Sequence, residues 1–535
     1  MDFSSPAACL DQLQRLHPID IPATQATLTR IIEGLLGAKP APNQHLEVLE
    51  AAREVIAYAQ HETARRYAAQ PLPPDSEENR TLLGVVNLWR KLSASYAQIA
   101  RADAAGGTLF DQRALLAQRR THYAGLALFE YFRAHRAVPA GFWTEIHTSY
   151  RDAIEAGVHR TRVADPLNEV WRAQSPLEAY VSILLLDLAN PYGRSERELN
   201  WVMRWAQRFA PYCSLSQDTQ QFKPTEYGVE LSGDIGLRPL GVQATTDTLQ
   251  RFDGSTLASQ IQAVLEQFKR GVKPASLGLG EDCPTDASAR LLLSLYRPWG
   301  RGTAGRRFPR RHKQGSAELS GDWLTIGFAV EGEIFRQPRL ESPLHLLRDD
   351  ISLFTFGERA MAVTDSQQAR ERNLRDAERL GLDYEQWDLM DHSVGGFRLR
   401  RGISGERLAH HQLVGVRPLD ADRFVLGDLS WLMYREDGVL EAGVEVLPGV
   451  PNMVAVRQTG PKDGRKPYQQ GFLLPESPSM KSPAALVLPV LWFQAGQLIE
   501  IRHRDQRRQV RLSRVLRRGA NFDLCTYEAV EPSPA

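Results

Sequence analysis

Cysteine is scarce in this chain, and the spacing of its cysteines argues against stabilisation of the fold by zinc or by disulfides. The 535 residues include only four cysteines, at Cys9, Cys213, Cys283 and Cys525. No two of them stand at C-x-x-C spacing, so we expect neither a zinc site nor a disulfide framework. The adjacent His410 and His411 have no cysteine or carboxylate at metal-ligand spacing, which favours a surface or turn role for them.

Long apolar runs and an excess of one charge are also lacking. No stretch approaches the ~20 apolar residues of a membrane span, and the longest candidate, residues 180–188, predicts a buried helix. The N-terminal segment has no basic region followed by an apolar core, so we expect no signal peptide and, by elimination, a cytoplasmic protein. The formal net charge of +1 gives no global field that would attract nucleic acid.

Signatures of common enzymes are absent as well. The sequence contains no G-x-x-x-x-G-K-[ST] phosphate loop, no G-x-G-x-x-G after a strand, no H-E-x-x-H and no G-x-S-x-G elbow. Neighbouring carboxylates such as Asp349 and Asp350 do not face one substrate together, so we interpret them as solvated charges. We therefore expect a protein that is not an enzyme and needs no cofactor.

Helical periodicity dominates the first 210 residues. Apolar positions recur at 3.6-residue spacing, as between Leu46 and Ala57, and short proline or glycine breaks separate the periodic stretches. We expect helices over residues 45–69, 81–104, 110–135, 140–156, 176–189 and 196–210. The pattern indicates a stack of antiparallel helix pairs with its aromatic residues in the core. By analogy with other helical stacks, its surface is interpreted as a binding site for a partner protein.

The composition changes after residue 210. Short alternating runs with glycine over 222–242 predict strands, and the stretches 256–271 and 286–296 predict helices. Residues 211–300 are therefore expected to form a small α+β linking domain. Near its end, Trp299 is favoured as a hydrophobic plug at the domain border over a stacking surface for a ligand ring.

An arginine-rich loop follows, reading RGTAGRRFPRRHK over residues 301–313. Its glycines predict a flexible approach, and Arg306, Arg307, Arg310 and Arg311 form a doubled R-x-x-x-R. Guanidinium groups bind phosphate in a bidentate manner and stack on flat rings. The alternative is that these arginines simply form a solvated basic loop.

A second motif lies in the stretch 387–401, WDLMDHSVGGFRLRR. Asp391, Ser393 and Gly396 form D-x-S-x-x-G, and the alternating residues after them predict a strand that leaves a tight turn. A carboxylate, a hydroxyl and a backbone without a side chain can present several hydrogen-bonding groups to one flat ligand edge. Alternatively, the aspartate and the serine satisfy backbone groups in a hairpin turn.

Together the two motifs resemble the PilZ domain, a bacterial receptor module for cyclic di-GMP, over roughly residues 306–450. The resemblance implies a six-stranded barrel in which arginines contact the phosphates and guanine, while the D-x-S-x-x-G turn contacts the guanine edge. The arginine positions fall on Arg306 and Arg310, or on Arg307 and Arg311 in the other register. The second motif falls on Asp391, Ser393 and Gly396.

The spacing of the two motifs departs from the PilZ pattern. Arg310 and Asp391 are 81 residues apart, whereas family members place only a strand or two between the motifs. The excess contains a helix-like segment near 365–380, which we interpret as an insertion between early strands, packed outside the barrel. Residues 322–336 before it predict two short strands.

The remaining residues predict further β-structure. The runs 423–435 and 438–447 predict a hairpin, and residues 452–535 predict a second small β-module. Basic residues alternate along 501–518 and could follow a phosphate backbone. The near-zero net charge and the few interleaved aromatic residues argue against nucleic-acid binding.

The sequence thus predicts an α+β multidomain protein, an all-α stack of helix pairs followed by antiparallel β-barrel modules of PilZ-like type. The expected domains are 1–210, 211–300, 301–451 and 452–535. We expect a cytoplasmic cyclic di-GMP receptor that relays binding to an unknown protein partner through its helical domain, without membrane insertion. The alternative is a ligand-free scaffold or chaperone-like protein with a degenerate barrel.

Overall fold

The computed structural model describes most of the chain. The residues outside the described part are 1–2, 4, 18, 105, 218–225, 243–245, 301, 303–314, 339–374, 376–377, 383, 403, 420, 422, 460–465, 504–505 and 531–535. Contacts divide the chain into two compact units, one holding most of residues 1–306 and the other most of residues 307–535. The first is largely helical and the second contains two β-barrels, so the predicted α+β multidomain fold is confirmed.

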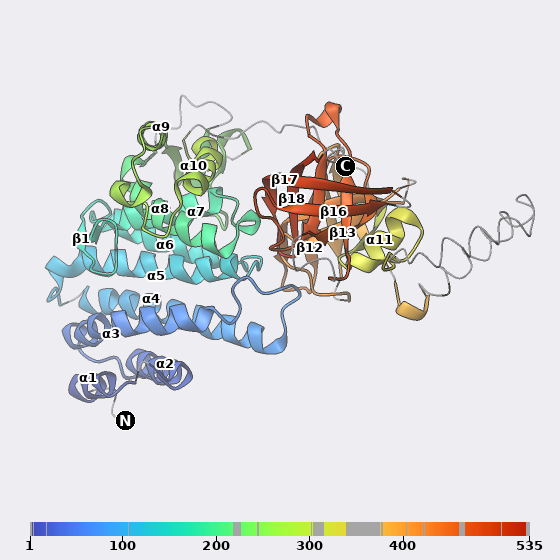
Figure 1. Ribbon diagram of the computed structural model, residues 1–535. Helices are drawn as coiled ribbons and strands as arrows, with labels where there is room; N and C mark the ends of the chain where they lie inside the picture. Colours follow the sequence, from blue (N-terminus) through green and yellow to red (C-terminus); the bar gives the residue numbers. More distant parts are fainter. Residues whose placement is uncertain are drawn as a thin grey trace, which may run out of the picture. The chain divides into compact units, whose positions relative to one another are not determined.

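The first unit begins with a stack of helices. Its helices are α1 (Pro6–Gln14), α2 (Ile21–Ala38), α3 (Pro42–Ala64), α4 (Ser76–Asp103), α5 (Arg113–Arg133), α6 (Phe142–Glu155), α7 (Pro176–Leu188) and α8 (Glu196–Phe209). Helices α3, α4 and α5 lie one above another (Figure 1). All six predicted helices are present, with boundaries within a few residues of those expected. Among the described helices, none is both long and apolar enough to cross a bilayer.

Capping boxes mark where three of these helices, α4, α7 and α8, begin. The Asp75 side chain accepts a hydrogen bond from the Glu78 backbone N–H at 2.8 Å, and the Glu78 carboxylate accepts one from the Asp75 backbone N–H at 2.8 Å. Ser175 begins α7 and Ser195 begins α8 with the same reciprocal arrangement. Such capping boxes satisfy backbone N–H groups that have no partner within the helix.

A small α+β portion completes the first unit. Its elements are β1 (Val163–Ala164), β2 (Ala173–Gln174), β3 (Ser214–Ser216), β4 (Tyr227–Glu230), β5 (Arg238–Pro239), β6 (Leu249–Asp253), α9 (Ser255–Lys269) and α10 (Thr285–Gly300). One continuous apolar core runs from Cys9 in α1 to Trp299 in α10. Trp299 is fully buried and donates its indole N–H to the Leu185 carbonyl at 2.8 Å, so its interpretation as a hydrophobic plug is confirmed.

The second unit starts with a closed six-stranded antiparallel barrel. Its strands are β7 (Gly315–Ser320), β8 (Glu385–Ser393), β9 (Gly396–Arg401), β10 (Leu413–Pro418), β11 (Val425–Tyr434) and β12 (Leu440–Val446), in the order β10-β11-β12-β9-β8-β7. The hairpin predicted over 423–447 is therefore confirmed as β11 and β12. Most of the expected helical insertion at 365–380 lies outside the described residues.

One predicted element of the first barrel is wrong. Residues 322–336 were expected to give two short strands, but they contain helix α11 (Trp323–Glu331). The Asp322 carboxylate begins the helix by accepting the Thr325 N–H at 2.8 Å, and Gly332 ends it with a left-handed φ of 74°. The run WLTIGFAV is apolar on every side, so periodicity alone does not separate helix from strand.

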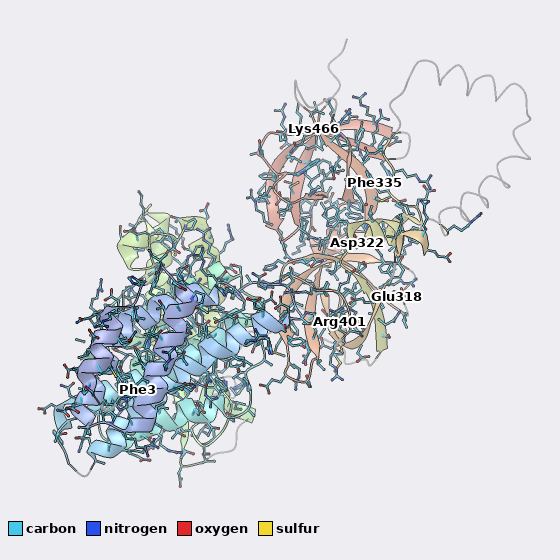
Figure 2. All side chains as sticks on the ribbon, turned by 90° about the horizontal axis from the view of Figure 1, so that it is seen from below. Phe3, Glu318, Asp322, Phe335, Arg401 and Lys466 are labelled. Atoms are coloured by element: carbon cyan, nitrogen blue, oxygen red, sulfur yellow. The ribbon has the colours of Figure 1, made fainter. Side chains whose placement is uncertain are left out.

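A second closed barrel follows and packs against the first. Its strands are β13 (Asn452–Gln458), β14 (Gln469–Leu474), β15 (Ala485–Pro489), β16 (Leu498–His503), β17 (Gln506–Arg518) and β18 (Phe522–Ala529), in the order β13-β14-β15-β18-β17-β16. Ile326 of α11 shares one apolar cluster with Leu413 of the first barrel and Phe472 of the second. Figure 2 shows Glu318 and Arg401 on the first barrel, Lys466 on the second, and Asp322, where α11 begins, between them.

Candidate functional site

The D-x-S-x-x-G motif forms the tip of the hairpin between β8 and β9. Ser393 pairs directly with Gly396, and Asp391 pairs with Arg398 after a bulge in β8. Ser393 Oγ accepts a hydrogen bond from the Gly395 N–H at 3.3 Å. Val394 at the turn is 70% exposed, whereas Asp391 is buried. The motif therefore places one buried carboxylate and one hydroxyl at one end of the first barrel.

Gly396 is required by the close approach of a neighbouring strand. It lies opposite Glu445 in the register of β9 and β12. A Cβ atom at this position would collide with the backbone carbonyl oxygen of Val444. Because that oxygen belongs to the main chain of a barrel strand, it cannot move aside as a flexible side chain could.

Strand β7, which follows the arginine-rich stretch in the sequence, begins on the motif side of β8. Arg306, Arg307, Arg310 and Arg311 lie outside the described residues. The first described residue after the loop, Gly315, begins β7 and pairs with Leu389 of β8. Leu389 is two residues before Asp391, so the chain enters the barrel at the end that carries the motif.

Described cations near this end are already engaged in ion pairs. Arg398, the cross-strand partner of Asp391, donates to Glu441 at 2.7 Å. Arg400 of the same strand has its Nε 4.0 Å from a carboxylate oxygen of Asp388 in β8. Phosphate contacts at this end would thus have to come from other arginines or from a rearrangement of these pairs.

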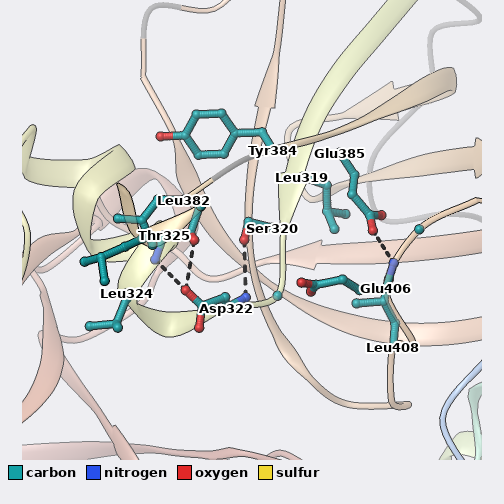
Figure 3. A pocket seen from close by; sticks show the side chains of 14 residues that line it. Leu319, Ser320, Asp322, Leu324, Thr325, Leu382, Tyr384, Glu385, Glu406 and Leu408 are labelled. Carbon is teal, nitrogen blue, oxygen red and sulfur yellow. Dashed lines mark hydrogen bonds between the residues drawn. The ribbon is translucent and has the colours of Figure 1, made fainter. Parts of the chain in front are cut away.

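A cavity of about 790 Å³ lies at the opposite end of β7 and β8 (Figure 3). Its walls include Asp322, Glu385 and Glu406 together with several leucines, and its described lining residues contain neither lysine nor arginine. Glu385 and Asp391 are six strand residues apart, which corresponds to about 20 Å along β8. The cavity and the motif are therefore separate features of the barrel.

The carboxylates of this cavity have structural partners. Asp322 accepts the Thr325 hydroxyl at 2.9 Å in addition to its N–H, and Glu385 accepts hydrogen bonds from Arg401 and from the Glu406 backbone. Three carboxylates around one space repel an anionic ligand. Because its described lining has carboxylates and neither lysine nor arginine, this cavity is chemically unsuited to a ligand with two phosphates.

An arginine of the second barrel forms ion pairs with strands β11 and β12 of the first barrel. Arg517 of β17 donates from Nη1 to the buried Asp428 of β11 at 2.7 Å, and its Nη2 lies 2.9 Å from Glu445 of β12. His411 Nδ1 lies 3.0 Å from the same Asp428 carboxylate. Burial acts to lower the pKa of Arg517, but Glu445 and Asp428 raise it above its ordinary value. We call Asp428, Arg517, His411 and Glu445 the inter-barrel latch.

Sequence reasoning missed the inter-barrel latch. Asp428 and Arg517 stand 89 residues apart in the chain, and neither belongs to a recognisable motif. The adjacent His410 and His411 predict a surface or turn role and give no sign of the contact with Asp428. In the described part of the chain, no group of three or more histidine, cysteine or acidic side chains is arranged to hold a metal ion.

Two protein-family models match this chain, and both describe parts of one class of protein, a receptor for cyclic di-GMP. The model described as "Cyclic-di-GMP receptor FimW, N-terminal domain" matches residues 7–220, the helical stack. The model described as "FimW C-terminal beta-barrel domain" matches residues 454–530, the second barrel. The predicted resemblance to a cyclic di-GMP receptor family is therefore confirmed, although the prediction named the PilZ domain over about 306–450 and the two models match ranges on either side of it. Both sequence motifs lie between the matched ranges.

A particular protein of this class is also similar to the chain in sequence. The chain is 23% identical over 426 residues to the cyclic-di-GMP receptor FimW of Pseudomonas aeruginosa. The aligned region covers 74% of this chain and 69% of that protein. The similarity therefore extends well beyond the ranges of the two family models.

Proposed function

We propose that this chain is a cytoplasmic receptor for cyclic di-GMP rather than an enzyme, and that it binds the nucleotide at the motif end of its first barrel. Asp391, Ser393 and the backbone at Gly396 contact the guanine edge. Arg306 and Arg310, or Arg307 and Arg311, contact the phosphates and stack on guanine. The name of the curated relative and the two family descriptions support the ligand.

The observation that carries this proposal is the register of β7 and β8. Gly315 pairs with Leu389, two residues before Asp391. Arg311 precedes Gly315 by four residues, so even a fully extended chain keeps their Cα atoms within about 14 Å. This short connection supports a site in which the loop arginines and the motif act together despite the 81 residues between Arg310 and Asp391.

The proposal is tested by calorimetric titration of the full chain with cyclic di-GMP. Removing Arg306 and Arg310, or Arg307 and Arg311, as paired alanine variants is expected to weaken binding by at least about tenfold, because hydrogen bonds between charged groups are lost. The melting temperature should not change. The matched control replaces Arg290 and Arg297, two exposed arginines of α10, and should bind as the wild type does. Unchanged affinity in both loop pairs would exclude the arginines from the site.

The helical unit contains a surface suited to the proposed protein partner. A groove of about 520 Å³ lies along α4 and α6, with the small residues Ala94 and Ala97 among its lining. Its charged lining residues are Arg90, Lys91, Arg101, Arg120 and Glu145. Arg90, Lys91 and Arg120 pair with Glu145, Glu33 and Asp152, so the groove presents charges of both signs that suit a polar partner segment.

Relay from the ligand to this surface can be measured without knowing the partner. Hydrogen exchange of the full chain, with and without cyclic di-GMP, should show changed protection in α4 and α6 as well as in β8 and β9. Changes limited to the first barrel would exclude the relay but leave the receptor proposal intact.

A further inference from the structure

Three segments that are far apart in the sequence line the acidic cavity of the first barrel (Figure 3). Residues 319–325 lead from β7 into α11, residues 380–385 lead into β8, and residues 405–408 lie between β9 and β10. The cavity volume of about 790 Å³ lies within the range of about 300–1,000 Å³ that is typical of sites for small molecules. The cavity is therefore large enough to hold a small ligand.

Leucine side chains form the apolar part of the lining. Leu319 and Leu408 are almost fully buried, whereas Leu324 is 40% exposed and Leu380 is 51% exposed. A single exposed leucine on a protein surface needs no explanation. Two exposed leucines beside one cavity, however, are apolar surface that a ligand with a hydrocarbon portion would remove from water.

The carboxylates of the lining differ in how far their charge is already neutralised. Glu385 forms an ion pair with the buried Arg401 and also accepts the Trp387 indole N–H at 3.2 Å. Asp322 has no basic partner among the described residues, and its carboxylate accepts the Thr325 N–H at 2.8 Å and hydroxyl at 2.9 Å. The N-terminal end of the α11 dipole offsets the Asp322 charge only in part.

Glu406 adds a second carboxylate whose charge is not neutralised. Its backbone N–H donates to Glu385 and its carbonyl accepts from Arg401, but no donor in the described part of the chain reaches its side chain. Figure 3 shows the Glu406 carboxylate pointing toward the side of the cavity where Asp322 lies. Once the Glu385–Arg401 pair is set aside, two negative charges therefore remain at the cavity.

These charges are spread along the cavity and do not converge on one point. Across the described residues, no three acidic, histidine or cysteine side chains lie close enough together to hold a metal ion. Separated carboxylates suit a ligand with two separated positive charges better than one compact cation. The leucines between and beside them suit an apolar connection between those charges.

We infer that this cavity binds a linear aliphatic diamine or polyamine, a molecule whose protonated amino groups are joined by methylene units. One ammonium group pairs with Asp322 and another with Glu406, while the methylene chain contacts Leu324 and Leu380. A free small molecule fits the cavity volume, whereas a stable contact with a protein segment buries about 800 Å² on each partner. The inference is independent of the proposed cyclic di-GMP site, which lies at the other end of β8.

The test is calorimetric titration of the full chain with diaminopropane, putrescine and cadaverine, which have three, four and five methylene groups. Affinity is expected to rise about twofold to fourfold with each added methylene, because each one leaves water for the leucine surface. Mg²⁺ carries the same charge without the methylene chain and should bind more weakly than cadaverine. An affinity that stays equal or falls along the series would overturn the inference, as would tighter binding of Mg²⁺.

Charge variants locate the site. Glu406→Gln is expected to weaken putrescine binding by about fivefold or more, because a hydrogen bond between charged groups is lost. Asp322→Asn should have a similar effect and keep the start of α11, since asparagine is also a preferred N-cap residue. The matched control is Glu476→Gln, at an exposed position of the second barrel, which should bind as the wild type does. Wild-type affinity in both cavity variants would exclude the site.

A leucine variant tests the apolar contact separately from charge. Leu324→Ser leaves every carboxylate in place, so it should reduce the preference for cadaverine over diaminopropane and leave diaminopropane affinity nearly unchanged. Leu491→Ser is the matched control, because Leu491 is a 77% exposed leucine of the second barrel. An unchanged preference for cadaverine in Leu324→Ser would count against the proposed ligand.

Two further titrations separate the occupants and the two sites. Spermidine should bind more tightly than a short peptide of alternating lysine and leucine, and tighter peptide binding would replace the small ligand with a protein segment. Ser393→Ala should leave putrescine binding unchanged, and Glu406→Gln should leave cyclic di-GMP binding unchanged. Failure of this inference and failure of the receptor proposal are therefore distinguishable.

Discussion

Gly396 belongs to the candidate site and is also a packing requirement of the first barrel. We expect Gly396→Ala to lower the free energy of unfolding by about 1–3 kcal/mol, as overpacking against a rigid neighbour does. The Cβ atom would press on the Val444 carbonyl oxygen. Gly402→Ala, next to the end of β9 with no atom in its way, should change stability by less than about 0.5 kcal/mol. Denaturant titration of both variants checks this, and similar losses would contradict it.

His45 provides a test of the helical unit through pH. It is buried in α3, and burial lowers its pKa from 6.5 to about 4. As the pH falls, His45 is therefore protonated in the unfolded chain at a higher pH than in the folded chain. The contribution of His45 to stability is fully present above about pH 6.5 and is lost toward pH 4, by about 3 kcal/mol in total.

This prediction is checked by thermal unfolding between pH 7 and pH 4, followed through the circular dichroism of the α-helices. His45→Gln should reduce the slope of melting temperature against pH, whatever its effect at pH 7. His61→Gln, at an exposed position of the same helix, should leave the slope unchanged. Parallel slopes in all three proteins would show that His45 does not titrate in this range.

At the scale of elements, the inter-barrel latch joins β17 to β11 and β12. Asp428→Asn removes the charge that Arg517 and His411 share, and Asp428 is fully buried. Breaking a buried pair from one side costs about 3–5 kcal/mol. We expect the variant to lower the unfolding midpoint of the two-barrel unit strongly. Glu445→Gln, at a half-exposed position of the same network, should cost about 1 kcal/mol or less, and equal costs would refute the latch.

The elements differ in how well the sequence predicts them. Helices α4, α7 and α8 were predictable because capping residues and apolar periodicity agree over many turns. The β11–β12 hairpin was predictable from two alternating runs. Helix α11 was not, because its run is apolar on all sides, and the six-residue strand β7 gives too short a pattern.

The candidate site was predictable only where its residues are contiguous. Asp391, Ser393 and Gly396 form one hairpin tip, so the motif gives both its turn and its position. The pairing of Gly315 with Leu389 crosses 74 residues and could be found only from the barrel. The acidic cavity likewise draws on three separate segments, and the sequence showed none of their carboxylates as part of a site.

At the scale of the whole molecule, the two barrels present opposite chemistry in their two prominent features. The cavity of the first barrel is lined by carboxylates, whereas the second gathers Arg457, Arg502 and Arg507 around Glu500. An anionic ligand is therefore expected to avoid the cavity although it is large.

The most direct test of the receptor assignment is a crystal structure of the full chain with cyclic di-GMP. We predict the nucleotide at the tip of the β8–β9 hairpin, with Asp391 and Ser393 on a guanine edge and one R-x-x-x-R pair on its phosphates. Density for the ligand in the acidic cavity, on the arginine cluster around Glu500 or on the helical unit, with the hairpin tip empty, would contradict the account.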